Sequence, residues 1–339
     1  MTKLFLTTLL TASAVTMALA DHGPGTSGSG VNTENAEILK PRQWSATLNF
    51  DWTEFDVPAE STLLGKDHFD LIDRSFLTTL SVGVGITENF QLSLAFGYYA
   101  AEGTREIAHG HGEGAAPEHA EEAGAEEGEH HEEETPTAEK PEFDTFDADG
   151  WTDLWLKAKY RLYRGPLGQV ALFGGVKIPI GDDRVFNSAG ERVEPASTPG
   201  SGAWDGLIGA AYTQSLTPSV AVDASAQYIV RGEKHDYRLG NRFDAGVALG
   251  WRFIGSAQSF PQVSLQAEAT VRSVTESKSL GERDPNTGGT VLFLSPGVRV
   301  RLCENAAWSV GMQFPVVQEL NGDQVETDFR LTSSVNISF

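Results

Sequence analysis

Five histidines and ten glutamates lie together in one short stretch, and these residue types suit metal binding. The stretch reads HGHGEGAAPEHAEEAGAEEGEHHEEE from residue 109 to residue 134 and holds no lysine or arginine. Its histidines are His109, His111, His119, His130 and His131. Neutral imidazoles and carboxylates suit Zn²⁺, Ni²⁺ and Cu²⁺, and the His-x-His and His-His spacings can bring several nitrogens to one ion. The stretch therefore predicts either weak capture of divalent cations or a solvated acidic loop with no ligand.

The acidic charge of the chain is concentrated around this stretch. Residues 102–147 hold sixteen acidic and two basic residues, which is −14 of the net charge of −22. The insert, residues 101–150, has too few large apolar groups to build a core, and its glutamates repel one another. We expect this insert to be one long disordered loop between two structured elements.

The N-terminus carries the pattern of an export signal. A positively charged start is followed by an apolar run and by Ala18-Leu19-Ala20, a small-x-small cleavage pattern. Residues 1–20 are therefore interpreted as a secretory signal peptide, and the next residue, Asp21, is not the cysteine that a lipid anchor needs. The rest of the chain has no apolar run of about 18 residues, so no transmembrane helix is expected.

A period of two dominates the sequence after residue 42. In the last twelve residues, DFRLTSSVNISF, one alternate set is almost entirely apolar and the other is polar. A strand points successive side chains to opposite faces, so one face is apolar and the other wet. The chain also ends on Phe339, an aromatic residue typical of the C-terminus of outer-membrane barrels. The same alternation predicts twelve strands, near 43–55, 73–86, 90–100, 151–163, 169–180, 203–214, 219–231, 239–253, 262–275, 290–302, 307–318 and 326–339.

These strands predict an all-β fold: a transmembrane, antiparallel, up-and-down β-barrel over residues 43–339 in a bacterial outer membrane. Each strand has close to the ten residues that cross this membrane at a tilt, whereas a soluble β-sandwich does not need strands this long. The expected partners are outer-membrane lipid, a small-molecule solute, and the barrel-assembly machinery through the strand that ends at Phe339. No nucleic-acid partner is expected.

Short and long connections alternate along the chain. Short links belong to the periplasmic end of such barrels and longer ones to the extracellular end. An even strand number places both termini in the periplasm, so the His/Glu insert, between the third and fourth strands, is expected outside the cell. Pro179 is expected at a strand end, and Pro296 and Pro315 at bulges, because proline removes a ladder hydrogen bond.

Charged residues of the polar set must point into the lumen, since a basic side chain at the membrane midplane costs about 2–4 kcal/mol. The basic residues assigned to a solute pathway are Lys157, Lys159, Arg161, Lys177, Arg252, Arg299, Arg301 and Arg330, and Arg231, Arg242 and Arg272 share their face. The acidic residues expected there are Asp51, Asp153, Asp205, Asp223, Asp244, Glu268 and Asp328. These charges either fill a rigid barrel with ion pairs or line a pathway, and the basic surplus favours anions.

The segment between the signal peptide and the first strand is rich in glycine and serine. Residues 21–42 begin DHGPGTSGSG and contain no strand pattern. Two interpretations remain open: a loose periplasmic tail, or a plug that folds into the lumen and turns an open pore into a gated one.

One family resemblance emerges from the fourth strand. The stretch DGWTDLWLKAKY, residues 149–160, resembles the D-G-x-x-D-L-x-L-x-x-K-Y segment of outer-membrane proteins grouped under the meta-pathway of phenol degradation. GVKIPIGD, residues 175–182, and GSGAWD, residues 200–205, match its continuation, although the usual P-T-G is P-I-G here. The resemblance covers residues 40–339 and implies an outer-membrane transporter, for aromatic or other hydrophobic compounds in some members. It brings no agreed ligand or catalytic residue and does not include the His/Glu insert.

These patterns predict a channel for the passive passage of a small anionic, polar or aromatic solute. The alternatives are a metal-binding surface protein involved in sequestration or resistance, and a filled structural barrel without transport. No enzyme is expected: G-x-S-x-G is absent, and His22, His68 and His235, the histidines outside the insert, lie in the tail or in predicted loops. No cofactor is expected apart from Zn, Ni or Cu at the insert.

Overall fold

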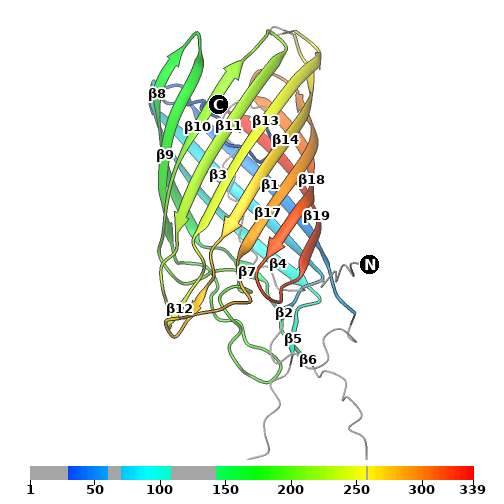
Figure 1. Ribbon diagram of the computed structural model, residues 1–339. Coiled ribbons are helices and arrows are strands. Elements are labelled where there is room, and N and C mark those ends of the chain that lie inside the picture. The colour runs from blue at the N-terminus through cyan, green and yellow to red at the C-terminus, as the bar shows by residue number, and fades with distance from the viewer. Residues whose placement is uncertain (1–29, 60–69, 108–142, 257–258) are drawn as a thin grey trace, which may run out of the picture.

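The computed structural model describes residues 30–59, 70–107, 143–256 and 259–339 (Figure 1). All twelve predicted strands fall within these ranges. The predicted signal peptide, residues 1–20, and the His/Glu stretch, residues 109–134, lie outside them.

The architecture is a closed antiparallel β-barrel of twelve long strands, as the sequence predicts (Figure 1). The barrel strands are β1 (Trp44–Asp56), β3 (Arg74–Thr87), β4 (Phe90–Glu102), β8 (Leu154–Gly165), β9 (Gly168–Ile178), β10 (Asp205–Ser215), β11 (Val220–Val230), β13 (Arg242–Ile254), β14 (Gln262–Val274), β17 (Gly289–Arg301), β18 (Ala306–Leu320) and β19 (Glu326–Ser338). A two-residue strand, β7 (Gly150–Trp151), extends the wall beside β4. The described part of the chain contains no candidate for a membrane-spanning helix.

The first and last strands close the ring. β1 pairs with β3 on one side and with β19 on the other, so that Trp52 lies opposite both Phe76 and Leu331. Beyond β19, the backbone N–H of Phe339 donates to the carbonyl of Trp44 at 2.9 Å, and the N–H of Trp44 donates to the carbonyl of Phe339 at 2.8 Å. A closed ring has no unpaired edge, which is the condition for a sheet to stand in hydrocarbon.

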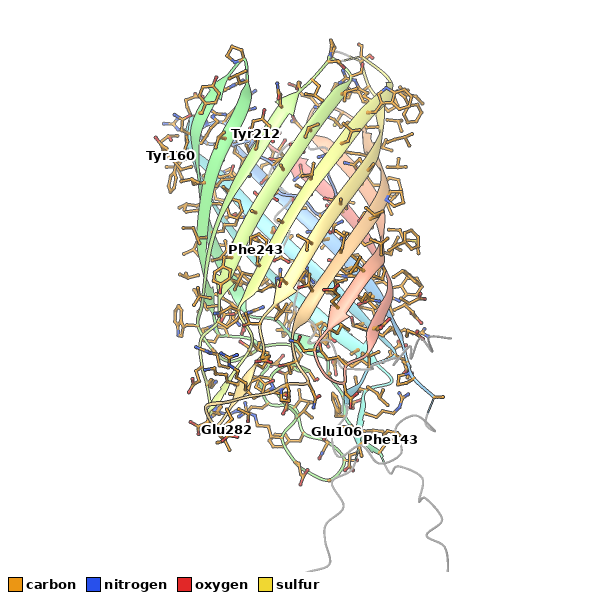
Figure 2. All side chains as sticks on the ribbon, viewed as in Figure 1. Glu106, Phe143, Tyr160, Tyr212, Phe243 and Glu282 are labelled. Carbon is orange, nitrogen blue, oxygen red and sulfur yellow. The ribbon has the colours of Figure 1, made fainter. Side chains whose placement is uncertain are left out.

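The alternation of side chains follows the sequence pattern. On β1, Ser45, Thr47 and Asn49 are buried, whereas Leu48 and Phe50 are exposed. In a barrel the buried face is the lumen, and the exposed apolar face meets lipid. Figure 2 shows side chains projecting outward from both sides of the barrel. The polar set of each strand therefore lines the inside.

Exposed aromatic residues mark both ends of the apolar band. Trp151 and Trp204 lie at the end with long connections, and Trp251 and Trp308 lie at the end with short turns. Tryptophan prefers the two membrane–water interfaces, so these residues frame the part of the wall that spans the bilayer. The protein is thus a barrel of the bacterial outer membrane.

Two of the three prolines lie within barrel strands, and the barrel stays closed around them. Pro179 directly follows β9, which ends at Ile178. Between β17 and β18 the register shifts at Leu292 and Phe293, opposite Val317 and Pro315. Pro296 lies opposite Ala267 on β14, and the register with β18 is the same on both sides of it, so the bulge expected at Pro296 is wrong. The expected bulge at Pro315 is confirmed.

Asp328 does not face the lumen, and its predicted orientation is wrong. The register between β1 and β19 shifts between Glu54 and Phe55, which lie opposite Phe329 and Thr327. Asp328 is the extra residue of this bulge and is exposed. An inserted residue reverses the parity of side chains, an effect that alternation alone does not reveal.

The long connections form small sheets beyond one end of the barrel (Figure 1). One sheet consists of β2 (Asp70–Leu71), β5 (Arg105–Ile107) and β6 (Phe143–Thr145), and the other of β12 (Tyr237–Arg238), β15 (Lys278–Ser279) and β16 (Glu282–Arg283). Leu71, Ile72 and Ile107 pack with Phe55 and Val325 in one apolar cluster. Long connections belong to the extracellular side of such barrels, so this end is the outer one.

Arginine in place of Val247, a lipid-facing residue in the middle of β13, should lower the free energy of unfolding by about 2–4 kcal/mol, because the charge loses its hydration at the midplane. Val247 is 55% exposed. Leu280, in the extracellular hairpin between β15 and β16, is 81% exposed and serves as the control. Leu280→Arg should change stability by less than about 0.5 kcal/mol. Chemical unfolding in lipid vesicles measures both, and equal effects would contradict the assigned membrane band.

Candidate solute pathway inside the barrel

Residues 30–39, here called the N-terminal segment, run along the inside of the barrel. Val31, Ala36 and Leu39 are almost completely buried. The segment is bound by side chains from five different barrel strands. The backbone N–H groups of Asn32, Glu34, Ala36 and Leu39 donate to the side chains of Glu268, Ser225, Thr213 and Gln91, in that order. The Asn32 side chain also donates to the Glu268 carboxylate. The Glu34 carboxylate accepts hydrogen bonds from Lys157 and Lys159.

Glu34 makes the strongest of these contacts. Its Oε2 lies 2.8 Å from Lys157 Nζ and its Oε1 lies 2.5 Å from Lys159 Nζ. The two lysines are two residues apart on β8, so both point to the same face of the strand. The side chains of Glu34 and Lys159 are 6% and 1% exposed. In such a dry site an unpaired charge is very costly, so the carboxylate and the ammonium groups stabilise each other.

A second set of charges forms a chain near the outer end of the lumen. Lys177 on β9 lies 3.0 Å from Asp153 and 2.8 Å from Asp205, and Arg231 lies 2.7 Å from the same oxygen of Asp205. All four residues are buried. Asp153 also accepts a hydrogen bond from the backbone N–H of Gly181, so the chain fastens a loop to the wall.

A third group lies on β13, β14 and β19. Arg242 and Arg272 both contact the carboxylate of Asp244, at 2.6 and 2.8 Å. Arg330 lines the same space, a cavity of about 50 Å³ that residues 32–34 cover on one side. This volume holds a few water molecules at most.

The arginines nearest the periplasmic end are tied to turns. Arg161 bonds the side chain of Asn89 in the β3–β4 turn, and Arg252 bonds the carbonyl of Pro218. Arg301 bonds Gln262 and lies with its guanidinium carbon 5.2 Å from the ring centre of Phe260. These contacts stabilise the wall itself.

The inner wall carries an apolar patch that the sequence analysis did not predict. Trp155 and Ile229 are buried in one cluster, Phe173 is buried in another, and Leu207 packs against both. Trp155 lies on the same face of β8 as Lys157 and Lys159, because the three residues are spaced two apart. Its inward orientation could therefore have been predicted from the sequence. Glu34 was missed because nothing in residues 21–42 signals where the segment goes.

The outer mouth is covered by loop residues. They pack on Leu77 and Tyr99, which point inward from β3 and β4, and the cluster is completed by Phe146, Ala148, Val185 and Val193. Lys234 joins a second loop to this cover through Asp183, at 2.7 Å. Burial alone would raise the pKa of Asp183, but the hydrogen bond and charge of Lys234 and the charge of Arg192 hold it below the usual value.

The structure places all eight basic residues of the predicted pathway on the inner wall, but distributes them among distinct groups. Lys157 and Lys159 hold Glu34, Lys177 belongs to the outer charge chain, and Arg330 lines the cavity. Their role in solute passage stays a prediction. The five histidines of the predicted metal site lie outside the described residues, among which no group of three metal-binding side chains occurs.

More than half of the chain matches one known protein family. Residues 122–319, more than half of the sequence, match the family described as the MetA-pathway of phenol degradation. The chain belongs to this family. No curated protein matches the sequence at a significant level.

Solved structures give the fold of this family member independently. The COG4313 outer membrane channel from Pseudomonas putida F1 is 13% identical, with 91% of this chain and 100% of that chain covered and a TM-score of 0.58. A Pseudomonas aeruginosa FadL homologue is 10% identical over 97% and 98% of the two chains, with a TM-score of 0.41, and is too distant to support an argument. The first likeness confirms the barrel fold.

Proposed function

We propose that this member of the family is an outer-membrane channel for a small anionic or aromatic solute, closed in this conformation by its own N-terminal segment. The observation that carries the proposal is the carboxylate of Glu34 between Lys157 and Lys159, deep inside a closed barrel. The proposed passage is passive: the solute moves through the barrel along its own concentration gradient.

The N-terminal segment can leave without damage to the sheet. It lies outside the ladder of the barrel, and side chains of the wall supply the hydrogen bonds that hold it. Removing a strand would break a continuous row of backbone bonds, whereas removing this segment breaks separate contacts. This difference favours a gated channel over a permanently filled structural barrel.

The charge of the inner wall favours anions. Of the residues predicted to face the lumen, eleven basic and six acidic ones lie on the wall once Asp328 is excluded. The N-terminal segment adds the carboxylates of Glu34 and Glu37, so its departure makes the lumen more positive. A positive lumen raises the local concentration of anions and lowers that of cations.

We also propose that the protein has no catalytic activity. His235 is an exposed loop residue, and His22 and His68 lie outside the described ranges. Strand β19 with Phe339 is the part that we propose the barrel-assembly machinery recognises.

Planar-bilayer recordings test the channel. The wild type should give small or rare current steps, and Glu34→Ala should raise the open probability at least about ten-fold, since loss of one buried ionic partner costs several kcal/mol. Asp328→Ala, which removes an exposed carboxylate outside the lumen, should leave the currents unchanged. Reversal potentials in a salt gradient should show anion preference. Absence of steps from the wild type and from Glu34→Ala would contradict the proposal.

We further propose that the His/Glu insert captures Zn²⁺, Ni²⁺ or Cu²⁺ weakly at the cell surface. Its composition is the support: five imidazoles and ten carboxylates with no basic residue between positions 109 and 134. The negative field of the insert attracts cations, while the inner wall repels them. The insert therefore serves as a sensor or cap and the lumen as the pathway.

Calorimetry with Zn²⁺ tests this capture. The full chain should release heat over several weak sites, and the signal should fall at low pH, because protonated imidazole cannot bind a metal. Deletion of residues 109–134 should abolish the heat. Equal heats from both proteins would remove the proposal.

A further inference from the structure

The two lysines that hold Glu34 form a preformed site for one carboxylate. Each carboxylate oxygen has its own ammonium group, at 2.8 Å for Lys157 and 2.5 Å for Lys159. The β8 backbone fixes their spacing, since both belong to one strand of the closed wall. The wall also constrains the side chains, because Lys159 is almost completely buried and Lys157 lies against the ring of Phe173. A second carboxylate can therefore use the same site.

An apolar surface adjoins this pair. The Nζ of Lys157 lies 4.6 Å from the ring centre of Phe173 on the neighbouring strand β9. Phe173 is packed with Ala171 and Ala211, and the cluster is covered by the methyl group of Ala36 in the N-terminal segment. Two residues of the segment, Glu34 and Ala36, thus present a carboxylate to the lysines and a methyl group to the apolar surface.

The site requires an anion in the described conformation. Lys159 is 1% exposed and Lys157 is 9% exposed, so both are largely shielded from water. Leaving buried ammonium groups without a negative partner is strongly unfavourable. A solute that brings a carboxylate can replace Glu34 and avoid this cost, whereas a neutral solute of the same shape cannot.

We propose that Lys157, Lys159 and the surface around Phe173 form a solute-binding site for carboxylates with a small apolar body, and that Glu34 and Ala36 occupy it as a tethered imitation of the solute. The proposal rests on the proposed function and names the solute class of the same lumen. It also explains why the channel is closed without solute: the tethered carboxylate has a high effective concentration, which free carboxylate must exceed.

Benzoate is the probe, and benzamide is its neutral counterpart of similar size. Titration calorimetry on the detergent-solubilised full chain should show weak benzoate binding to the wild type. Glu34→Ala should bind benzoate at least about ten-fold more tightly, because the tethered competitor is gone. Benzamide should give no saturable heat. Adding Lys157→Met and Lys159→Met to Glu34→Ala should abolish benzoate binding.

Asn32→Ala provides the matched control. It removes the side-chain bond from the same segment to Glu268, 2.9 Å long, but leaves Glu34 in place. Its benzoate affinity should rise less than about three-fold, because the competitor remains attached. If Glu34→Ala does not fold, as judged by heat-dependent migration in gels, Glu34→Gln retains the size of the side chain and should show the same direction of change.

Three results would overturn the proposal: benzoate affinity unchanged by loss of the Glu34 charge, binding that survives replacement of both lysines, or equal gains in Asn32→Ala and Glu34→Ala. The calorimetric result is independent of conductance. A protein that binds benzoate but never conducts would contradict the proposed channel and support the proposed carboxylate site. A protein that conducts but binds no carboxylate would support the channel and contradict the site.

Discussion

Every backbone N–H and C=O in a hydrocarbon layer must find a partner within the protein, and a closed sheet meets this requirement. The ring is completed where β1 meets β19 and where Trp44 exchanges two backbone bonds with Phe339. Once the wall is closed, strand parity allows only two destinations for a side chain. Apolar residues meet lipid, and the polar residues of the same strands must share a narrow interior.

That interior sets a second requirement, because charges shielded from water need partners. Within the wall, Asp205 joins Lys177 to Arg231, and Asp244 joins Arg242 to Arg272. The lysine pair on β8 receives its carboxylate from the N-terminal segment instead. Removing one partner from a buried pair costs about 3–5 kcal/mol, a large part of a typical folding free energy. Electrostatics can thus hold a segment that has no place in the sheet.

The sequence predicted the barrel well because one local signal, a period of two, also decides the global fold. The expected strand at 262–275 is observed as Gln262–Val274, and that at 90–100 as Phe90–Glu102. Asp328 was placed on the wrong face because a bulge changes parity without changing composition. The position of Glu34 could not be predicted, since its partners are more than 120 residues away and are chosen by the closed barrel.

The carboxylate of Glu34 binds the lysines of β8 inside the barrel, and a double-mutant cycle measures this interaction. Glu34→Ala, Lys159→Met and the combined variant would be unfolded in lipid vesicles and their free energies of unfolding compared. We predict a coupling free energy of about 1–3 kcal/mol between the two positions. Additive effects, within about 0.5 kcal/mol, would show that the two side chains do not interact and would contradict this claim.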